Sequence, residues 1–386
     1  MRTPLFSRLL AALLATLPLL AHAALPSPAA IDAEAQRLMA AAQARGMAVA
    51  VVDNGQVVHV AAYGHRNAAG DPLQTDTVMY GASLTKAVFG HAVMQLVDDG
   101  TLDLDKPLAS YLAQPLPEYP RDGKYGPYQH LASEPRWRQL TARMLLTHSG
   151  GFANFAFLEP DGRLRMHFDP GTRYAYSGEG LILLQFVIEK GLGLDLGEIT
   201  QRRLFDPLGM TRTSLIWRAD FRPNLADGWT EDGKAEPHDE RSRVRVAGSM
   251  DTTIADFARF AAGYVNGVGL KPASAAELTK PQLAITTASQ FPTLQPELPA
   301  DQRRADLSAG LGVVTFTGPQ GPGFYKGGHN DSTGNTWVCV KAGKRCVVIL
   351  GNDVRAERTF PKLVEFILGD TGVPWRWEYG EKAFVK

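Results

Sequence analysis

Several features that this 386-residue chain lacks exclude whole classes of function. It carries no net charge, because 40 basic and 40 acidic residues cancel, so we expect neither a nucleic acid nor an anionic membrane as a partner. Cysteine is scarce: Cys339 and Cys346 are the only two, and no histidine stands at ligand spacing from them. We therefore expect no metal site. Beyond the first residues, no apolar run is long enough to span a bilayer.

Several signatures of other enzyme classes are also missing. No Gly-x-Ser-x-Gly sequence occurs, so the nucleophile turn of the α/β-hydrolases is excluded. Neither a Gly-x-Gly-x-x-Gly after a strand nor a Walker-type loop is present, which argues against nucleotide binding. The sequence therefore predicts a protein that works without a cofactor.

Residues 1–23 are typical of a secretory signal peptide. Arg2 and Arg8 supply positive charge, Leu9–Ala21 is apolar, and Ala21-His22-Ala23 is a small-x-small cleavage pattern. The apolar run is too short for a spanning helix, and no cysteine near the cleavage site could carry a lipid. We expect cleavage after Ala23, one mature domain over residues 24–386, and a periplasmic or secreted location.

Two predicted hairpins lie near the ends of the chain. Asp53-Asn54-Gly55 separates two apolar runs within Met47–Tyr63, which is a strong hairpin signal. A two-residue turn at Ala342-Gly343 would place Cys339 opposite Cys346, where a disulfide and two free thiols are both open. The middle, residues 88 to about 275, is helical where periodic. Strands at both ends predict one sheet formed by the two terminal regions, with helices packed on it.

Ser83-Leu84-Thr85-Lys86 is the first stretch that suggests chemistry. Helical periodicity follows it from Ala87 to Val97. Residues three apart lie on one helix face, so the lysine amine comes within reach of the serine hydroxyl, which needs such a neighbour to become nucleophilic. On its own, the tetrapeptide is explained as well by an N-cap serine and a solvated lysine.

A second stretch, Pro170–Gly180, places Tyr176 in a glycine-rich turn before an expected helix over Leu181–Ile188. Nearby lysines that lower the pKa of Tyr176 would allow its hydroxyl to take the serine proton. Tyr174 competes for that role, and packing against the core is the alternative for either tyrosine.

The third stretch is Lys326-Gly327-Gly328-His329. Its glycines allow a substrate backbone to approach the chain closely, and Lys326 adds positive charge. A lysine in a surface turn is the alternative. As a lone histidine, His329 is expected to be structural or to face solvent.

In this order, Ser83–Lys86, Tyr176–Gly178 and Lys326–Gly328 resemble the three motifs of the serine β-lactamase and penicillin-binding-protein superfamily. The flanks resemble its class C β-lactamase and serine esterase branch; they are Leu96-Val97-Asp98-Asp99-Gly100-Thr101-Leu102, Met144-Leu145-Leu146-Thr147-His148-Ser149-Gly150-Gly151, Asp206-Pro207-Leu208-Gly209-Met210 and Val347-Val348-Ile349-Leu350-Gly351-Asn352. The resemblance covers about residues 35 to 370. It implies an α/β (α+β) fold of the β-lactamase/transpeptidase type, an antiparallel sheet flanked by helices plus a mostly helical region, with the site between them.

The resemblance also implies roles for individual residues. Ser83 would be the acyl-forming nucleophile, Lys86 its hydrogen-bonded partner and Tyr176 the proton shuttle. Lys326 would place positive charge beside Tyr176, and the backbone N–H groups of Ser83 and His329 would form the oxyanion hole. We therefore expect an exported serine hydrolase that acts on a small ester or amide. A D-alanyl-D-alanine carboxypeptidase-type cell-wall peptidase and a non-catalytic penicillin-binding relative are the alternatives.

Two positions differ from the family pattern. Gly178 stands where the family usually has an asparagine that helps to hold a substrate amide, and Gly327 stands where a residue with a hydroxyl is usual. Both differences favour an esterase or amidase over an enzyme built for β-lactams. In another register His329 takes the place of the lysine, but the distance to the following hairpin fits Lys326 better.

Two further segments spell similar motifs outside the expected flanks. Tyr264-Val265-Asn266 follows an expected helix over Asp256–Ala262, and Lys341-Ala342-Gly343 is the tip of a predicted hairpin. We therefore assign neither of them to the site.

Overall fold

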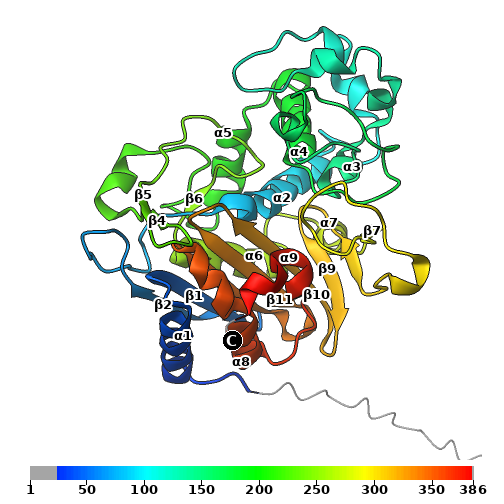
Figure 1. The fold of residues 1–386 in the computed structure, drawn as a ribbon. Coiled ribbons are helices and arrows are strands. Elements are labelled where there is room, and N and C mark those ends of the chain that lie inside the picture. The colour runs from blue at the N-terminus through cyan, green and yellow to red at the C-terminus, as the bar shows by residue number, and fades with distance from the viewer. Residues whose placement is uncertain (1–23, 385–386) are drawn as a thin grey trace, which may run out of the picture.

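The computed structural model describes residues 24–384, so the predicted signal peptide lies outside the described residues. The described part is built on an eight-stranded antiparallel sheet with the order β2-β1-β12-β11-β10-β9-β8-β7 (Figure 1). β1 pairs with β12 from Met47 opposite Gly351 to Val52 opposite Cys346. This pairing confirms that strands from both ends of the chain form one sheet.

The strands of the large sheet are β1 (Gly46–Asp53), β2 (Gln56–Gly64), β7 (Leu283–Ala284), β8 (Leu307–Ala309), β9 (Val314–Gly318), β10 (Gly321–His329), β11 (Gly334–Val340) and β12 (Arg345–Gly351). Two small sheets pair β3 (Met79–Tyr80) with β6 (Asp251–Thr252) and β4 (Gly228–Trp229) with β5 (Ala235–Glu236). The helices are α1 (Pro28–Ala42), α2 (Thr85–Asp98), α3 (Ala142–Leu146), α4 (Gly178–Phe186), α5 (Leu196–Thr200), α6 (Ile254–Asn266), α7 (Pro272–Leu278), α8 (Phe360–Leu368) and α9 (Trp375–Tyr379). Among residues 24–384, no helix is both long and apolar enough to cross a membrane.

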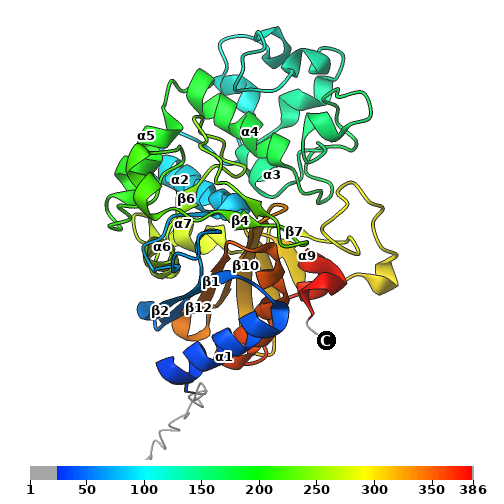
Figure 2. The same cartoon turned by 60° about the vertical axis from the view of Figure 1, so that its left-hand side comes forward.

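The two faces of the sheet are covered by different helices. Alternate residues of a strand point to opposite faces: Val49 and Val51 join the buried cluster that contains α1 and α8, while Ala48 and Ala50 join the cluster that contains α2 and α6. Figure 2 shows α1 lying across the sheet and the region with α3, α4 and α5 above it. The molecule therefore has a sheet part and a mostly helical part, as predicted.

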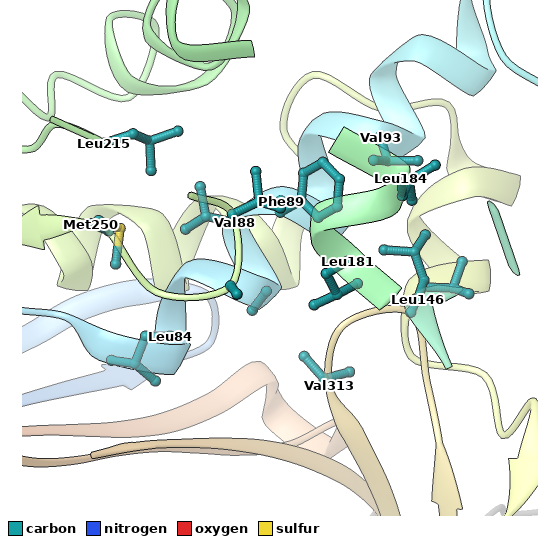
Figure 3. Packing of buried hydrophobic residues seen from close by; sticks show 14 of the residues in the cluster. Leu84, Val88, Phe89, Val93, Leu146, Leu181, Leu184, Leu215, Met250 and Val313 are labelled. Atoms are coloured by element: carbon teal, nitrogen blue, oxygen red, sulfur yellow. The ribbon is translucent and has the colours of Figure 1, made fainter. Parts of the chain in front are cut away.

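Helix α2 connects these two parts. Its side chains are buried on almost every side, as expected of a helix inside a large core. Val88, Phe89 and Val93 lie in one cluster with Leu181 and Leu184 of α4 (Figure 3). A residue at the first turn of α2 is therefore fixed by packing against both parts.

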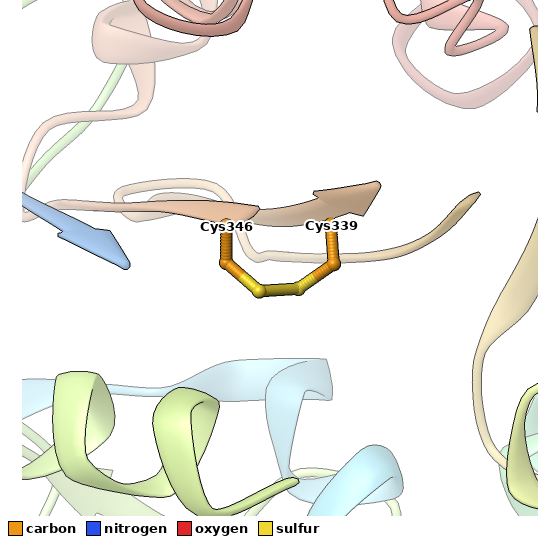
Figure 4. Close-up of a disulfide and its surroundings, with 2 residues drawn as sticks. All are labelled: Cys339 and Cys346. Carbon is orange, nitrogen blue, oxygen red and sulfur yellow. A yellow bond between two sulfur atoms is a disulfide. The ribbon is translucent and has the colours of Figure 1, made fainter. Parts of the chain in front are cut away.

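Both predicted hairpins form, with one correction. The turn between β1 and β2 is Asn54-Gly55, as predicted, and both residues are left-handed, with φ of 50° and 72°. In the second hairpin the predicted pairing of Cys339 with Cys346 is correct, and the two cysteines form a disulfide on the sheet face that α2 and α6 cover (Figure 4).

The two-residue turn predicted for this second hairpin is wrong. The last pair is Val340 with Arg345, so four residues, 341–344, close the hairpin. The carbonyls of Gly343 and Lys344 in this wider loop accept hydrogen bonds from the backbone N–H groups of Asn54 and Gly55. The contact between the two hairpin tips explains the longer loop.

The middle of the chain is less regular than the periodicity suggested. Between residues 100 and 140 the structure has 3₁₀ turns, at Leu108–Tyr111, Leu116–Glu118, Tyr128–Leu131 and Pro135–Gln139. The helix expected over Leu181–Ile188 is α4, which begins earlier and continues as a π-helical turn over Val187–Gly191. The helix expected over Asp256–Ala262 is the longer α6.

Candidate active site

Ser83 lies in a 3₁₀ turn, Ala82–Leu84, that leads directly into α2. Ala82 before it is left-handed, with φ of 46°, a conformation that costs a residue other than glycine about 1–2 kcal/mol. The Thr85 hydroxyl donates to the Ala82 carbonyl over 2.5 Å, and the Asn335 side chain donates to the Tyr80 carbonyl over 3.0 Å. Contacts on both sides therefore hold the strained turn in place.

Lys86 extends from the first turn of α2 towards the serine, as the spacing predicted. Its Nζ donates to Ser83 Oγ over 2.8 Å and to the Ala247 carbonyl. The amine is almost completely buried, with 1% of the residue exposed. Burial lowers the pKa of Lys86 well below its usual value, and the nearby charge of Lys326 lowers it further, against a smaller opposing effect of Glu378. The neutral amine of this lysine is therefore more accessible than that of a lysine in solvent.

Tyr176, rather than Tyr174, reaches the serine. Its hydroxyl donates to Ser83 Oγ over 2.8 Å, whereas the hydroxyl of Tyr174 donates to Gln290 Oε1 over 3.1 Å. Tyr176 is fixed because the next residue, Ser177, caps α4 by accepting from the Gly180 N–H. The structure thus decides between two tyrosines that the sequence left open.

His148 packs against the turn that carries Tyr176. Its ring centroid lies 4.6 Å from that of Tyr176, and its Nδ1 accepts from the Ser177 N–H over 3.1 Å. Burial lowers the pKa of His148 well below its usual value, and the charges of Lys86 and Lys326 lower it further. A neutral imidazole is the form that can accept at Nδ1, so His148 acts as a positioning residue.

The condition under which Tyr176 would take the serine proton, a lowered pKa, is not met. Burial raises the pKa of this phenol, and this effect exceeds that of the hydrogen bond to Ser83, which lowers the pKa. Two lysine amines do lie near the ring, Lys86 Nζ at 4.9 Å and Lys326 Nζ at 5.2 Å from its centroid. The burial of the phenol itself still dominates, so Tyr176 keeps its proton in the resting site, and Lys86, whose pKa is lowered, is the better candidate for the base.

Lys326 occupies the position predicted for the third motif. It is buried on β10, and its Nζ donates to the Gly327 carbonyl over 2.7 Å. Burial lowers its pKa, while the charge of Glu378 acts in the opposite direction. The amine thus faces Tyr176 from the sheet side, as Lys86 does from the helix side.

Glu378 is a site residue that sequence reasoning missed. A Cβ added at Gly327 would lie 2.2 Å from Glu378 Oε1, so the carboxylate fills the space that a side chain at position 327 would need. Burial raises the pKa of Glu378, against the effect of Lys326. Glu378 lies on α9, 52 residues after Lys326, and no local pattern indicates that this helix returns to β10.

The side chain of His329 does not take the place of the lysine. Its Nδ1 lies 3.3 Å from Glu357 Oε1, and the side chain is 36% exposed. Burial lowers the pKa of His329, but the hydrogen bond and charge of Glu357 outweigh it and raise the pKa overall. The alternative register is therefore not the one in the structure, although His329 does line the cavity next to Ser83.

A cavity of about 550 Å³ opens above Ser83. Its lining includes Ser83, Lys86, Tyr176, His329, Glu378, Phe155, Ile182 and Phe291. Its volume lies in the range of small-molecule sites. Phe155 fills the space next to Gly178, because a Cβ added there would lie 2.6 Å from two atoms of its ring. No sequence pattern indicates Phe155 or Phe291, since both come from irregular segments.

A second wall of the cavity is polar and carries Asp239, Arg241, Arg243 and Arg245. The Arg241 guanidinium lies 3.4 Å from Asp251 and 3.6 Å from the centroid of the Tyr80 ring. Its charge is therefore already partnered within the protein.

The two motif-like segments lie outside the site. Tyr264 is buried between Phe260 and Trp337, whose ring centroids lie 5.6 Å and 4.9 Å from its own. Lys341 is at the hairpin tip, where its Nζ donates to the Thr279 carbonyl over 3.0 Å. Neither segment contributes to the cavity above Ser83.

Comparison with known proteins identifies the family. The family model described as "Beta-lactamase" matches residues 31–368. A lovastatin esterase from Penicillium rubens is 34% identical over 180 residues, which are 40% of this chain and 44% of that protein. The chain thus spans less than half the length of that relative. Esterase EstB from Burkholderia gladioli is 27% identical over 310 residues, covering 72% of this chain and 73% of that protein.

Solved structures share the fold. D-alanine carboxypeptidase AmpC from Burkholderia cenocepacia superposes with a TM-score of 0.69 at 21% identity, covering 89% of this chain and 99% of that one. The octameric penicillin-binding protein homologue from Pyrococcus abyssi gives 0.68 at 19% identity, covering 88% and 77%. The predicted fold class is therefore confirmed.

Proposed function

Because this chain belongs to the beta-lactamase family, we propose that it is a serine hydrolase that forms an acyl-enzyme on Ser83. One observation carries the proposal: Ser83 Oγ lies 2.8 Å from both Lys86 Nζ and Tyr176 Oη at the base of a cavity. A nucleophile with two polar partners in hydrogen-bond contact is the arrangement that acyl transfer needs. The family as a whole acts on small esters, amides or peptides.

In the first step Lys86 is the base. Its neutral amine takes the Ser83 proton while Oγ bonds to the substrate carbonyl carbon. The bond to the leaving group then breaks, and the leaving oxygen takes a proton from the Tyr176 hydroxyl, which Lys86 restores. In the second step water gives a proton to Lys86 as its oxygen bonds to the acyl carbon. The bond between that carbon and Ser83 Oγ then breaks, Oγ takes the proton back from Lys86, and the acid is released. In this proposal Tyr176 keeps only one of its two expected roles, the transfer of a proton to the leaving group. The other, taking the proton of Ser83, passes to Lys86, because the depressed pKa belongs to Lys86.

The oxyanion hole is proposed at the backbone N–H groups of Ser83 and His329. β9 pairs with β10 only as far as Tyr325, so the remainder of β10 has no strand on that side and packs against the Ser83 turn. A Cβ added at Gly328 would lie 2.9 Å from Ser83 N. The strand therefore passes close enough for both donors to reach one carbonyl oxygen.

We propose neutral esters as the substrates. Two relatives bear the name esterase. In this chain the Glu378 carboxylate lies against Gly327 beside the reacting centre. The acidic side chain thus occupies the place beside Gly327, where no hydroxyl is present to hold a substrate carboxylate close to the scissile bond, as in a β-lactam or a D-alanyl peptide.

Export is proposed on separate grounds. The pattern of residues 1–23 supports it, and so does the Cys339–Cys346 disulfide, because such bonds persist in oxidising compartments. N-terminal sequencing of the protein from its native cells tests this proposal. A mature chain that begins at Ala24 in the periplasm or medium is expected, and an intact Met1 in the cytoplasm would contradict it.

The catalytic proposal is tested by intact-protein mass spectrometry after brief exposure to a fluorophosphonate. One adduct is expected on the wild type and none on Ser83→Ala. Ser242→Ala is the matched control, because Ser242 lines the same cavity but is exposed. An adduct on Ser83→Ala, or none on the folded wild type, would contradict the proposal. A long-lived penicillin adduct would favour the cell-wall peptidase instead.

A further inference from the structure

One wall of the cavity above Ser83 is aromatic. The ring of Phe155 lies so close to Gly178 that any Cβ at position 178 would overlap it. Gly178 itself follows Tyr176 by two residues, so this ring stands next to the reacting centre. Ile182, one turn further along α4, lines the same cavity.

The aromatic surface continues beyond the residues that line the cavity. Phe157 stacks on Phe155 with centroids 5.3 Å apart and planes 8° apart, yet Phe157 is 74% exposed and the adjacent Leu158 is 58% exposed. Phe291, which also lines the cavity, is 37% exposed, and its ring centroid lies 5.3 Å from that of Tyr176. Exposed apolar side chains that adjoin a cavity are typical of a binding surface.

This surface belongs to the cavity and is not a separate patch. Phe155 and Phe291 both line the cavity that holds Ser83, so a group bound between them lies close to a carbonyl attacked by Ser83 Oγ. Burying apolar substrate area there is favourable in proportion to that area.

We propose that Phe155 and Phe291 bind a bulky apolar group of the substrate next to the scissile ester, so that aromatic or longer aliphatic esters are preferred to acetates. This inference rests on the proposed function and specifies the substrate class of the same site. The apolar group belongs to the acid or to the alcohol of the ester, and two substrate series distinguish these sources.

The first series varies the acid, with p-nitrophenyl acetate, hexanoate and phenylacetate. The second keeps the acetyl group and varies the alcohol, with ethyl, hexyl and benzyl acetate. After correction for spontaneous hydrolysis, we expect kcat/KM in one series to be at least tenfold higher for the bulky ester than for the smallest one. We expect Phe155→Ala, or Phe291→Ala if the first variant does not fold, to lower this ratio at least fivefold.

Phe366→Ala is the matched control. Phe366 is 40% exposed and lies on α8, which packs on the sheet. The control should leave the ratio unchanged within twofold. A ratio near one in both series, or a ratio that survives both substitutions at the cavity, would overturn the inference.

Labelling rates with ethyl and dodecyl fluorophosphonates separate the two proposals. Labelling of Ser83 that is at least fivefold faster with the dodecyl reagent supports the apolar wall without requiring turnover. Labelling at equal rates overturns only this inference. A folded protein that neither reagent labels overturns the proposed function, and this inference with it.

Discussion

The substitution Gly328→Ala tests the proposed oxyanion hole, because it adds a single methyl group next to one of the two proposed donors. The φ of Gly328 lies outside the left-handed region, so alanine can adopt the backbone, but the new Cβ would lie 2.9 Å from Ser83 N and 3.0 Å from Leu84 N. Either the methyl covers the Ser83 N–H or β10 moves away from the turn. Both outcomes remove one donor, which costs about 10²–10³ in kcat, or about 2.7–4 kcal/mol. The overpacking itself should cost about 1–3 kcal/mol of stability.

The assay is kcat for p-nitrophenyl acetate per folded enzyme, together with thermal unfolding. Gly323→Ala is the matched control on the same strand, since its Cβ would lie 2.4 Å from the Phe316 ring and 2.7 Å from the Cys339 carbonyl, away from Ser83. We expect both variants to lose stability, but the control should keep kcat within about threefold, because no oxyanion donor is touched. If folded Gly328→Ala retained more than a tenth of the wild-type kcat, the oxyanion hole would not lie between β10 and the Ser83 turn.

Further predictions concern charge and the disulfide. Because Lys86 must be neutral to act and Lys326 lowers its pKa, Lys326→Met should move the acid limb of the kcat/KM profile to higher pH; an unmoved limb would refute Lys86 as the base. Glu378 raises the Lys86 pKa, so Glu378→Gln should move the same limb to lower pH, and a shift in the other direction would contradict this electrostatic reasoning. Replacing Cys339 and Cys346, seven residues apart, by alanine should cost about 2.5 kcal/mol from the loop alone. The midpoint of thermal unfolding should then fall by about 3 °C. An unchanged midpoint under oxidising conditions would contradict a stabilising disulfide.

The local parts of the site could be predicted from the sequence. Ser83 and Lys86 are three residues apart on one helix start, so their contact follows from helix geometry alone. The turn Asn54-Gly55 and the pairing of Cys339 with Cys346 are local in the same sense. Even local geometry was predicted only in part, since the loop that closes the second hairpin has four residues and contacts the distant tip at Asn54-Gly55.

The parts that depend on distant segments could not be predicted. Tyr174 and Tyr176 share one turn, and only the packing of that turn on His148 and Ser83 decides which hydroxyl reaches the nucleophile. Glu378 arrives from a C-terminal helix. The direction of the Tyr176 pKa shift also depends on burial in the complete fold.

The close packing of Phe155 on Gly178 has a consequence for how such a site can evolve. A side chain gained at position 178 would meet the ring at 2.6 Å, so that mutation is harmful while Phe155 is present. Neighbouring positions of this kind are not additive. A polar side chain at position 178 is therefore tolerated only after Phe155 has been replaced by a smaller residue. The required order of these two mutations limits which substrate specificities can evolve from this site.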